Sequence, residues 1–477
     1  MLRWPHRIVG ALGCFGGVGF GVLTALSSVP IGIGAVVAVA FATLVLLNLE
    51  VSLVVWTFAS LFEATPALEL AVKGATVLVF LAWLAAFAYR PGVLGDLLRR
   101  HGPLVAGVAG LVLWLTVSVA WSERPDVGLT LVSWYLAGVV FLMTSTLVVD
   151  ERHVRWVLAA LVAGTAITAL AGLGGTPFGA GLPFVGSAVL EDRLQGGLAD
   201  PNFFASVLVA AIALSGGLLA GARGLLARAG LLALIGLFTL SVAATQSRGG
   251  LLAFLAAAVA AVLVLRGRRL VLLGLVGFLL AVSAVAFSAS PDALERVTTF
   301  EEGGTGRTDI WKVSLAIARD HPVMGVGIGN FAVHSPRYVD QVGPLERVDL
   351  IAEDLLVAHS FYLELLTETG VIGLGLFLLV VGGGLAACWR AARRLDQLGE
   401  RSLAALALSI FVAIVGVLAG GVFVSGGQDE RLWVLLGLGP AMLAVASRRA
   451  ASRTPERSPP VEAPPLREQP APAMAGG

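Results

Sequence analysis

Apolar stretches of about 20 residues follow one another along most of the chain, separated by short polar segments. A helix needs about 20 mostly apolar residues to cross the hydrocarbon core of a bilayer. The pattern therefore predicts an all-α integral membrane protein with about 12 to 14 transmembrane helices. The candidate spans cover residues 8–26, 29–47, 49–62, 70–90, 103–121, 128–148, 154–173, 201–219, 226–244, 249–266, 270–288, 360–388, 402–424 and 431–447.

The apolar stretch at 8–26 follows two arginines and resembles a signal peptide, but no clear small-residue cleavage site comes after it. We predict that it is retained as a signal-anchor helix. The next stretches are ambiguous because 49–62 is short for a span. The segment 8–63 therefore contains either three spans or one span with a re-entrant piece.

One long hydrophilic segment, 290–358, interrupts the apolar pattern and divides the chain. We expect an N-terminal transmembrane bundle at 1–289, a large loop with short helices at 290–358 and C-terminal transmembrane helices at 359–449. Within the loop, the stretch from Asp309 to Ala318 has the spacing of an amphipathic helix that could lie on the membrane surface. The tail at 450–477 is rich in proline, alanine and glutamate, and we predict that it is disordered.

The composition agrees with a membrane protein, because 57% of the residues are hydrophobic and only 13% are charged. The formal net charge of +1 and the lack of a basic patch argue against a nucleic-acid partner. Arginine clusters recur in alternate loops, and cytoplasmic loops of membrane proteins carry this excess. The bias predicts a multi-pass plasma (inner) membrane protein with both termini cytoplasmic and the 290–358 loop extracytoplasmic.

Charged residues are scarce on the predicted outer side, so those present are candidates for function. Arg193 precedes the sequence Asp200-Pro201-Asn202, and Ser247-Arg248 lies at a glycine-rich corner between two spans. Structural roles compete with these interpretations. Asp200 could cap the helix that Pro201 begins, and Arg248 could extend to the membrane surface without binding a substrate.

Two further sets of candidate residues lie in the hydrophilic loop and at the start of the span that follows it. Arg307 lies just before the predicted amphipathic helix and Trp311 lies within it, whereas His359 and Ser360 lie at the start of the span at 360–388. A polar helix-entry residue is the structural alternative for His359. The nearby Gly325, Gly327 and Gly329 follow no predicted strand, so we reject a dinucleotide site and expect a flexible turn on a lid-like loop.

Several arginines and one histidine suggest a particular chemistry. Guanidinium groups bind phosphate through two parallel hydrogen bonds and stay charged. An imidazole titrates near neutral pH and can take a proton from a hydroxyl. Together they predict group transfer from a lipid-linked phosphate or pyrophosphate to a hydroxyl, with arginines stabilising the leaving group. No metal-ligand spacing is present, so we expect no metal and no cofactor.

The motif His359-Ser360, followed after nine residues by Gly370-Val371-Ile372-Gly373, resembles the signature of the O-antigen ligase and O-antigen polymerase superfamily. The resemblance implies a glycosyltransferase-C-like fold, a polyprenyl-pyrophosphate-linked glycan donor and a metal-independent glycosyltransferase. It implies His359 as general base on the acceptor hydroxyl, and Arg193, Arg248 and Arg307 as pyrophosphate ligands. The expected supporting residues are Asp200, Asn202, Ser247, Trp311, Ser360 and Glu368.

The motif does not identify the acceptor substrate. Ligases often have threonines after the last glycine, whereas this chain has Leu374-Gly375 there. A glycan, a glycolipid or a protein could accept the sugar, with membrane lipids as surrounding partners. The alternatives are therefore a ligase, a polymerase of lipid-linked repeat units and a protein O-oligosaccharyltransferase. A secondary transporter is a fourth alternative, against which the lack of an internal repeat argues.

Overall fold

The computed structural model describes residues 29–63, 66–89, 92–124, 127–173, 189–190, 193–198, 200–265, 273–278, 280–281, 284, 307–345 and 357–453. Almost all of this part is helical, and one short antiparallel pair joins β1 (Val189–Leu190) to β2 (Arg193–Leu194). The protein is an all-α integral membrane protein. The predicted span at 8–26, the tail beyond 453 and most of the predicted span at 270–288 lie outside the described residues.

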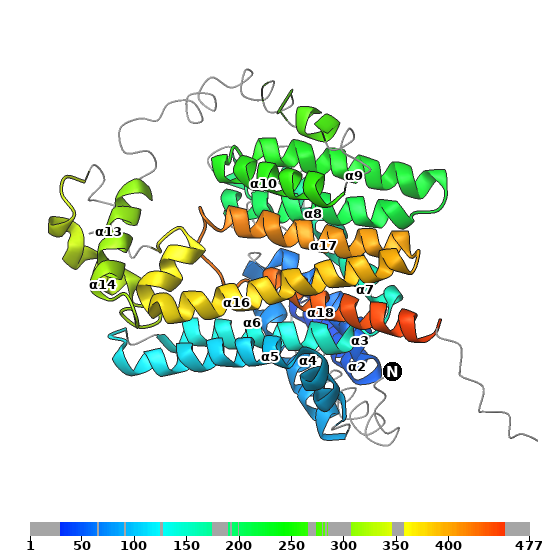
Figure 1. Cartoon of the computed structure of the whole chain (residues 1–477), viewed down its shortest axis with the longest axis horizontal. Coiled ribbons are helices and arrows are strands. Elements are labelled where there is room, and N and C mark those ends of the chain that lie inside the picture. The colour runs from blue at the N-terminus through cyan, green and yellow to red at the C-terminus, as the bar shows by residue number, and fades with distance from the viewer. Residues whose placement is uncertain are drawn as a thin grey trace, which may run out of the picture.

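The helices follow the apolar pattern closely (Figure 1). In the first half they are α2 (Val29–Leu47), α3 (Leu49–Ala59), η1 (Ser60–Phe62), α4 (Pro66–Tyr89), α5 (Gly92–Ser118), η2 (Val119–Trp121), α6 (Val127–Leu147), α7 (Glu151–Leu173) and η4 (Gly196–Leu198). In the second half they are α8 (Pro201–Gly221), α9 (Leu225–Ala244), α10 (Arg248–Val264), α13 (Arg307–Asp320), α14 (Phe331–Tyr338), η5 (Val339–Gln341), α16 (Phe361–Gln397), α17 (Arg401–Gly420) and α18 (Glu430–Ala451).

Within the described residues, eight helices are long and apolar enough to cross a membrane. Four more apolar helices, Val37–Leu47, Leu49–Phe62, Ala71–Ala86 and Arg248–Val264, are shorter. Helix α16 runs on to Gln397, nine residues beyond the predicted end, because the apolar core of the span leads into an amphipathic last part. Helices α13 and α14 lie together at one end of the bundle, away from the end of α18 (Figure 1).

Small residues let α8 and α17 approach each other closely in the centre of the bundle. A Cβ atom at Gly217 would lie 2.1 Å from the Ser409 hydroxyl, and one at Gly420 would lie 1.9 Å from the Ser206 hydroxyl. Helices within a membrane associate through such close van der Waals packing, since lipid tails are as apolar as leucine. This contact holds the N-terminus of α8 beside the turn that follows α17.

Helix α16 is broken at Gly370, which has φ 66° and ψ −169° inside an otherwise helical segment. This backbone conformation is essentially restricted to glycine. A Cβ atom at Gly370 would lie 2.1 Å from the Val323 carbonyl oxygen, so a loop backbone passes directly against the break. The Val371 amide donates to the Pro322 carbonyl at 2.9 Å and thereby recovers a hydrogen bond that the break removes.

The loop satisfies the carbonyl groups on the other side of the break. The Val326 amide donates to the Thr367 carbonyl at 2.9 Å, and the Gly327 amide donates to the Glu368 carbonyl at 2.8 Å. Unpaired backbone groups are costly inside a protein or a membrane. The backbone hydrogen bonds lost at the break in α16 are therefore replaced by hydrogen bonds to the loop, and the loop backbone is satisfied by the same contacts.

The glycine-rich turn of the loop is packed, and this corrects the prediction of a flexible turn. Gly325, Gly327 and Gly329 have φ values of 69°, 97° and 72° and are buried. A Cβ atom at Gly325 would lie 2.3 Å from the Glu368 carbonyl carbon, and one at Gly327 would lie 3.0 Å from Ser122. Glycine is needed here because both the left-handed backbone and the close approach exclude a side chain.

We expect Gly370→Ala to destabilise the protein, because the backbone conformation alone costs about 1 to 3 kcal/mol for a non-glycine residue and the added methyl group meets the loop. Thermal unfolding in detergent measures the effect. The matched control is Gly375→Ala in the same helix, where no atom lies within 4 Å of the added carbon. Equal melting temperatures for the two variants would contradict the docking of the loop on the break.

Candidate functional site

Arg193 is anchored between two segments that are far apart in the sequence. Its Nε donates to the Thr245 carbonyl at 3.1 Å, and its Nη2 donates to the Asn202 side-chain oxygen at 3.2 Å. The Ser247 hydroxyl donates to the same Asn202 oxygen at 2.8 Å. Asn202 therefore connects the start of α8 to the corner between α9 and α10, and it orients Arg193.

The starts of α8 and α10 lie side by side, and each has a capping side chain. Asp200 accepts from the amides of Asn202 at 2.6 Å and Phe203 at 2.8 Å, which confirms it as the N-cap that Pro201 follows. Ser247 accepts from the Gly250 amide at 2.9 Å, so Arg248 is the first residue of α10.

Arg307 begins α13 and brings a third guanidinium group to these helix starts. Burial lowers its pKa, the Asp200 carboxylate raises it, and the charges of Arg193 and Arg248 lower it. These effects require the four charged groups to lie near one another. Three positive charges around one carboxylate, beside two helix N-termini, form a site suited to an anion.

His359 joins the same cluster from the start of α16. Burial lowers the pKa of its imidazole, the positive charge of Arg307 lowers it further, and Asp200 acts in the opposite direction. The lowered pKa favours the neutral imidazole, which is the form that can accept a proton. Ser360 caps α16, and the Phe361 amide donates to the Gly421 carbonyl at 2.8 Å, which fixes this end of the helix against the turn after α17.

Backbone strain marks this region. In the described part of the chain, the non-glycine residues with positive φ are His359, at 47°, and Gln246, at 49°. Both values lie in the left-handed region, which side chains adopt at a cost. One of these residues is the candidate base, and the other lies two positions before Arg248.

Trp311 supports the cluster through packing. Its ring lies 5.9 Å from that of Phe423, centroid to centroid, and a Cβ atom at Gly249 would lie 3.0 Å from Phe423. Phe423 therefore packs against Trp311 of α13 and against Gly249 of α10. Trp311 lies one turn after Arg307 in α13.

Glu368 contacts the loop that packs against the break in α16. Its carboxylate accepts from the Phe331 amide at 3.2 Å, so it holds the start of α14 and the glycine-rich turn. This contact gives Glu368 a role in positioning the loop, while its expected support of the site stays a prediction. Its sequence spacing from His359 gave no signal of this, because the contact depends on the break in α16.

Arg431 is a mostly buried cation at the start of α18. Its guanidinium forms an ion pair with Asp429, lies 3.6 Å from Glu63 and donates to the Ser60 carbonyl at 2.6 Å. It also lies 5.2 Å from the centre of the Phe203 ring. Arg431 therefore joins the α3–α4 and α17–α18 connections to the start of α8 and has a structural role.

Among the described residues, no group of three or more His, Cys, Asp or Glu side chains could hold a metal ion. The groups that the structure brings together are instead guanidinium, imidazole, amide and hydroxyl groups. This donor set suits an anionic substrate with a neighbouring hydroxyl.

A family model described as O-antigen ligase matches residues 231–378. Over that segment the chain is similar to the O-antigen ligase superfamily. The match confirms the predicted family, and it contains Arg248, Arg307 and His359, whereas Arg193 lies before it. No curated protein matches the chain. This similarity, together with the membrane-spanning helices, supports a role as a glycan ligase or polymerase at a membrane.

We expect Asp200→Asn to lower the pKa of His359 further, because it removes the carboxylate that raises that pKa. Asparagine still caps a helix, so α8 is retained. NMR titration of 13C-labelled histidine measures the shift, with the His359 signal assigned from His359→Asn. The exposed Asp340→Asn is the control and should leave the signal unchanged. A pKa that rises in Asp200→Asn would contradict the proximity of the two groups.

Proposed function

We propose that the protein transfers a glycan from a polyprenyl-pyrophosphate carrier to an acceptor hydroxyl. The observation that supports this most directly is the grouping of three arginines and a neutral His359 around Asp200, two of the arginines and the histidine lying within the family-matched segment. The donor carries two phosphates and a lipid tail, and the cluster lies at the ends of membrane-spanning helices.

In this mechanism His359 removes the proton from the acceptor hydroxyl as its oxygen attacks the anomeric carbon of the donor sugar. The bond between that carbon and the pyrophosphate oxygen breaks, and the pyrophosphate leaves on the carrier lipid. Negative charge develops on the leaving oxygen. Arg193, Arg248 and Arg307 stabilise it, and stabilisation by preoriented positive groups is a large part of catalysis in many enzymes.

We further propose that the arginine cluster faces the extracytoplasmic side of the plasma membrane and that both termini are cytoplasmic. Support comes from the opposite end of the bundle, where Arg155, Arg394, Arg448 and Arg449 gather. Such an excess of arginine is typical of cytoplasmic surfaces. Cysteine accessibility labelling in intact cells tests this orientation.

We expect His359→Asn to reduce transfer by about a hundred- to ten-thousand-fold, the usual contribution of a general base. Asparagine tolerates the left-handed backbone of position 359 but cannot take the proton. The assay combines purified protein, lipid-linked glycan and candidate acceptors, with products identified by mass spectrometry. The melting temperature of the variant serves as the folding control. Retention of most of the activity in a folded variant would exclude His359 as the base.

The same assay distinguishes the acceptors. A ligase joins the glycan to a glycolipid core, a polymerase extends a second lipid-linked glycan, and a protein O-oligosaccharyltransferase modifies a hydroxyl of a polypeptide. The product mass identifies which acceptor is used. Solute uptake without any change in glycan products would instead support a transporter.

We expect Arg248→Lys and Arg307→Lys each to reduce transfer by about 10- to 100-fold, because lysine keeps the charge but loses the paired hydrogen bonds to phosphate. Steady-state rates on purified donor measure the loss. The control is Arg319→Lys, an exposed position in the same helix as Arg307. If both variants kept full activity, the arginines would have no role in binding pyrophosphate.

A further inference from the structure

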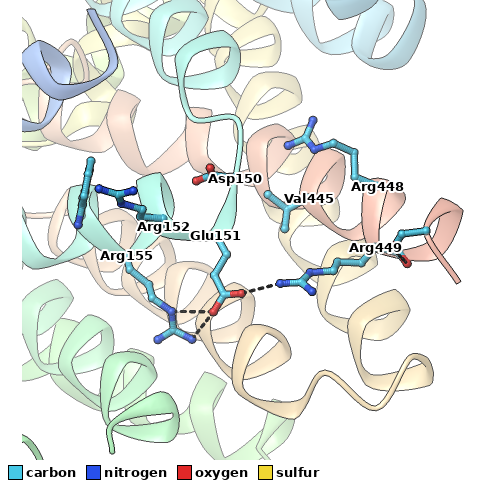
Figure 2. Close-up of a pocket in the computed structure, with 9 residues that line it drawn as sticks. Asp150, Glu151, Arg152, Arg155, Val445, Arg448 and Arg449 are labelled. Carbon is cyan, nitrogen blue, oxygen red and sulfur yellow. Dashed lines mark hydrogen bonds and ion pairs between the residues drawn. The ribbon is translucent and has the colours of Figure 1, made fainter. Parts of the chain in front are cut away.

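A second arginine-rich site lies at the opposite end of the bundle, between α7 and α18. A cavity of about 660 Å³ is bordered there by Arg152 and Arg155 from α7 and by Arg448 and Arg449 from α18 (Figure 2). Neither the family match nor the proposed transfer involves these residues.

The carboxylates of this cavity are already engaged. One Glu151 oxygen pairs with Arg155 at 2.9 Å, and the other pairs with Arg449 at 3.0 Å (Figure 2). Asp150 is bonded to the His153 ring at 2.7 Å. Among the described residues, no ion pair joins Arg152 or Arg448 to a carboxylate.

The two arginines without a carboxylate are nevertheless held in place. The Arg152 guanidinium lies 4.2 Å from the centre of the Trp156 ring, and Arg448 donates to the Val149 carbonyl. Stacking orients the Arg152 guanidinium, and the hydrogen bond to a backbone carbonyl orients the Arg448 guanidinium. Neither contact neutralises the positive charge. Arg100 lies near Arg448 and adds to the positive potential, and the nearby Asp150 carboxylate offsets part of it.

The cavity combines charged groups with one partly exposed aromatic ring. Glu151 is the first residue of α7 and Ala451 the last of α18, so the arginines lie where both membrane-spanning helices end. Trp156, next to Arg155 in α7, is a partly exposed apolar residue of the lining, whereas Val445 is buried. Tryptophan is typical of the boundary between lipid tails and water. This polarity matches a molecule with a charged head and an apolar tail.

We propose that this cavity binds the phosphate headgroup of an anionic phospholipid, with Arg152 and Arg448 on the phosphate and the acyl chains beside Trp156. Basic pockets between transmembrane helices bind such headgroups in other membrane proteins. The lipid joins α7 to α18 through its phosphate. This proposal does not depend on glycan transfer.

The test is native mass spectrometry of the full chain titrated with dioleoylphosphatidylglycerol. We expect the double variant Arg152→Gln/Arg448→Gln to weaken retention of the first lipid by about 25-fold, or about 5-fold for each arginine. The matched control is Arg390→Gln/Arg401→Gln, which removes two exposed arginines of α16 and α17. It should retain the lipid like the unchanged protein.

Three results would overturn the proposal. They are equal retention of dioleoylphosphatidylcholine, an equal loss in both double variants, and displacement of the lipid by millimolar inorganic phosphate, which would indicate a site for the free anion. Thermal unfolding shows whether the variant is folded. If it is not, single Arg152→Lys and Arg448→Lys variants, which keep the charge, should retain the lipid, and a complete loss in them would also overturn the proposal.

Discussion

The break of α16 at Gly370 is the constraint on which the end of the molecule with the candidate site depends. A membrane-spanning helix cannot lose backbone hydrogen bonds without replacement. The loop segment from Pro322 to Gly327 supplies that replacement, and it can approach only because Gly325 and Gly370 have no side chains. The position of this loop segment is therefore determined by its backbone hydrogen bonds to α16.

That docking has consequences for the candidate site. The loop carries α13, and the first residue of α13 is Arg307. The short helical segment before the break begins at Phe361, and its N-cap Ser360 directly follows His359. A single arrangement of backbone hydrogen bonds thus places both a guanidinium group and the imidazole relative to the helix starts that hold Arg193 and Arg248.

The two ends of the bundle use arginine in different ways. At the loop end, Arg193 is oriented by Asn202 and Thr245, and Arg431 is neutralised by Asp429, so structural and functional cations are separated. At the other end, Glu151 connects two helices, while Arg152 and Arg448 keep their charge. Pairing, more than residue type, determines which arginines can bind an anion.

The sequence by itself determined the helices, because about 20 apolar residues can satisfy their backbone in a bilayer only as a helix. It also determined the caps at Asp200 and Ser360, which are local, and the family, through the His359 motif. Tertiary structure alone decided the break at Gly370, the burial of the glycine-rich turn and the contact of Glu368 with Phe331. These features depend on contacts between distant segments, and no local pattern of polarity encodes such contacts.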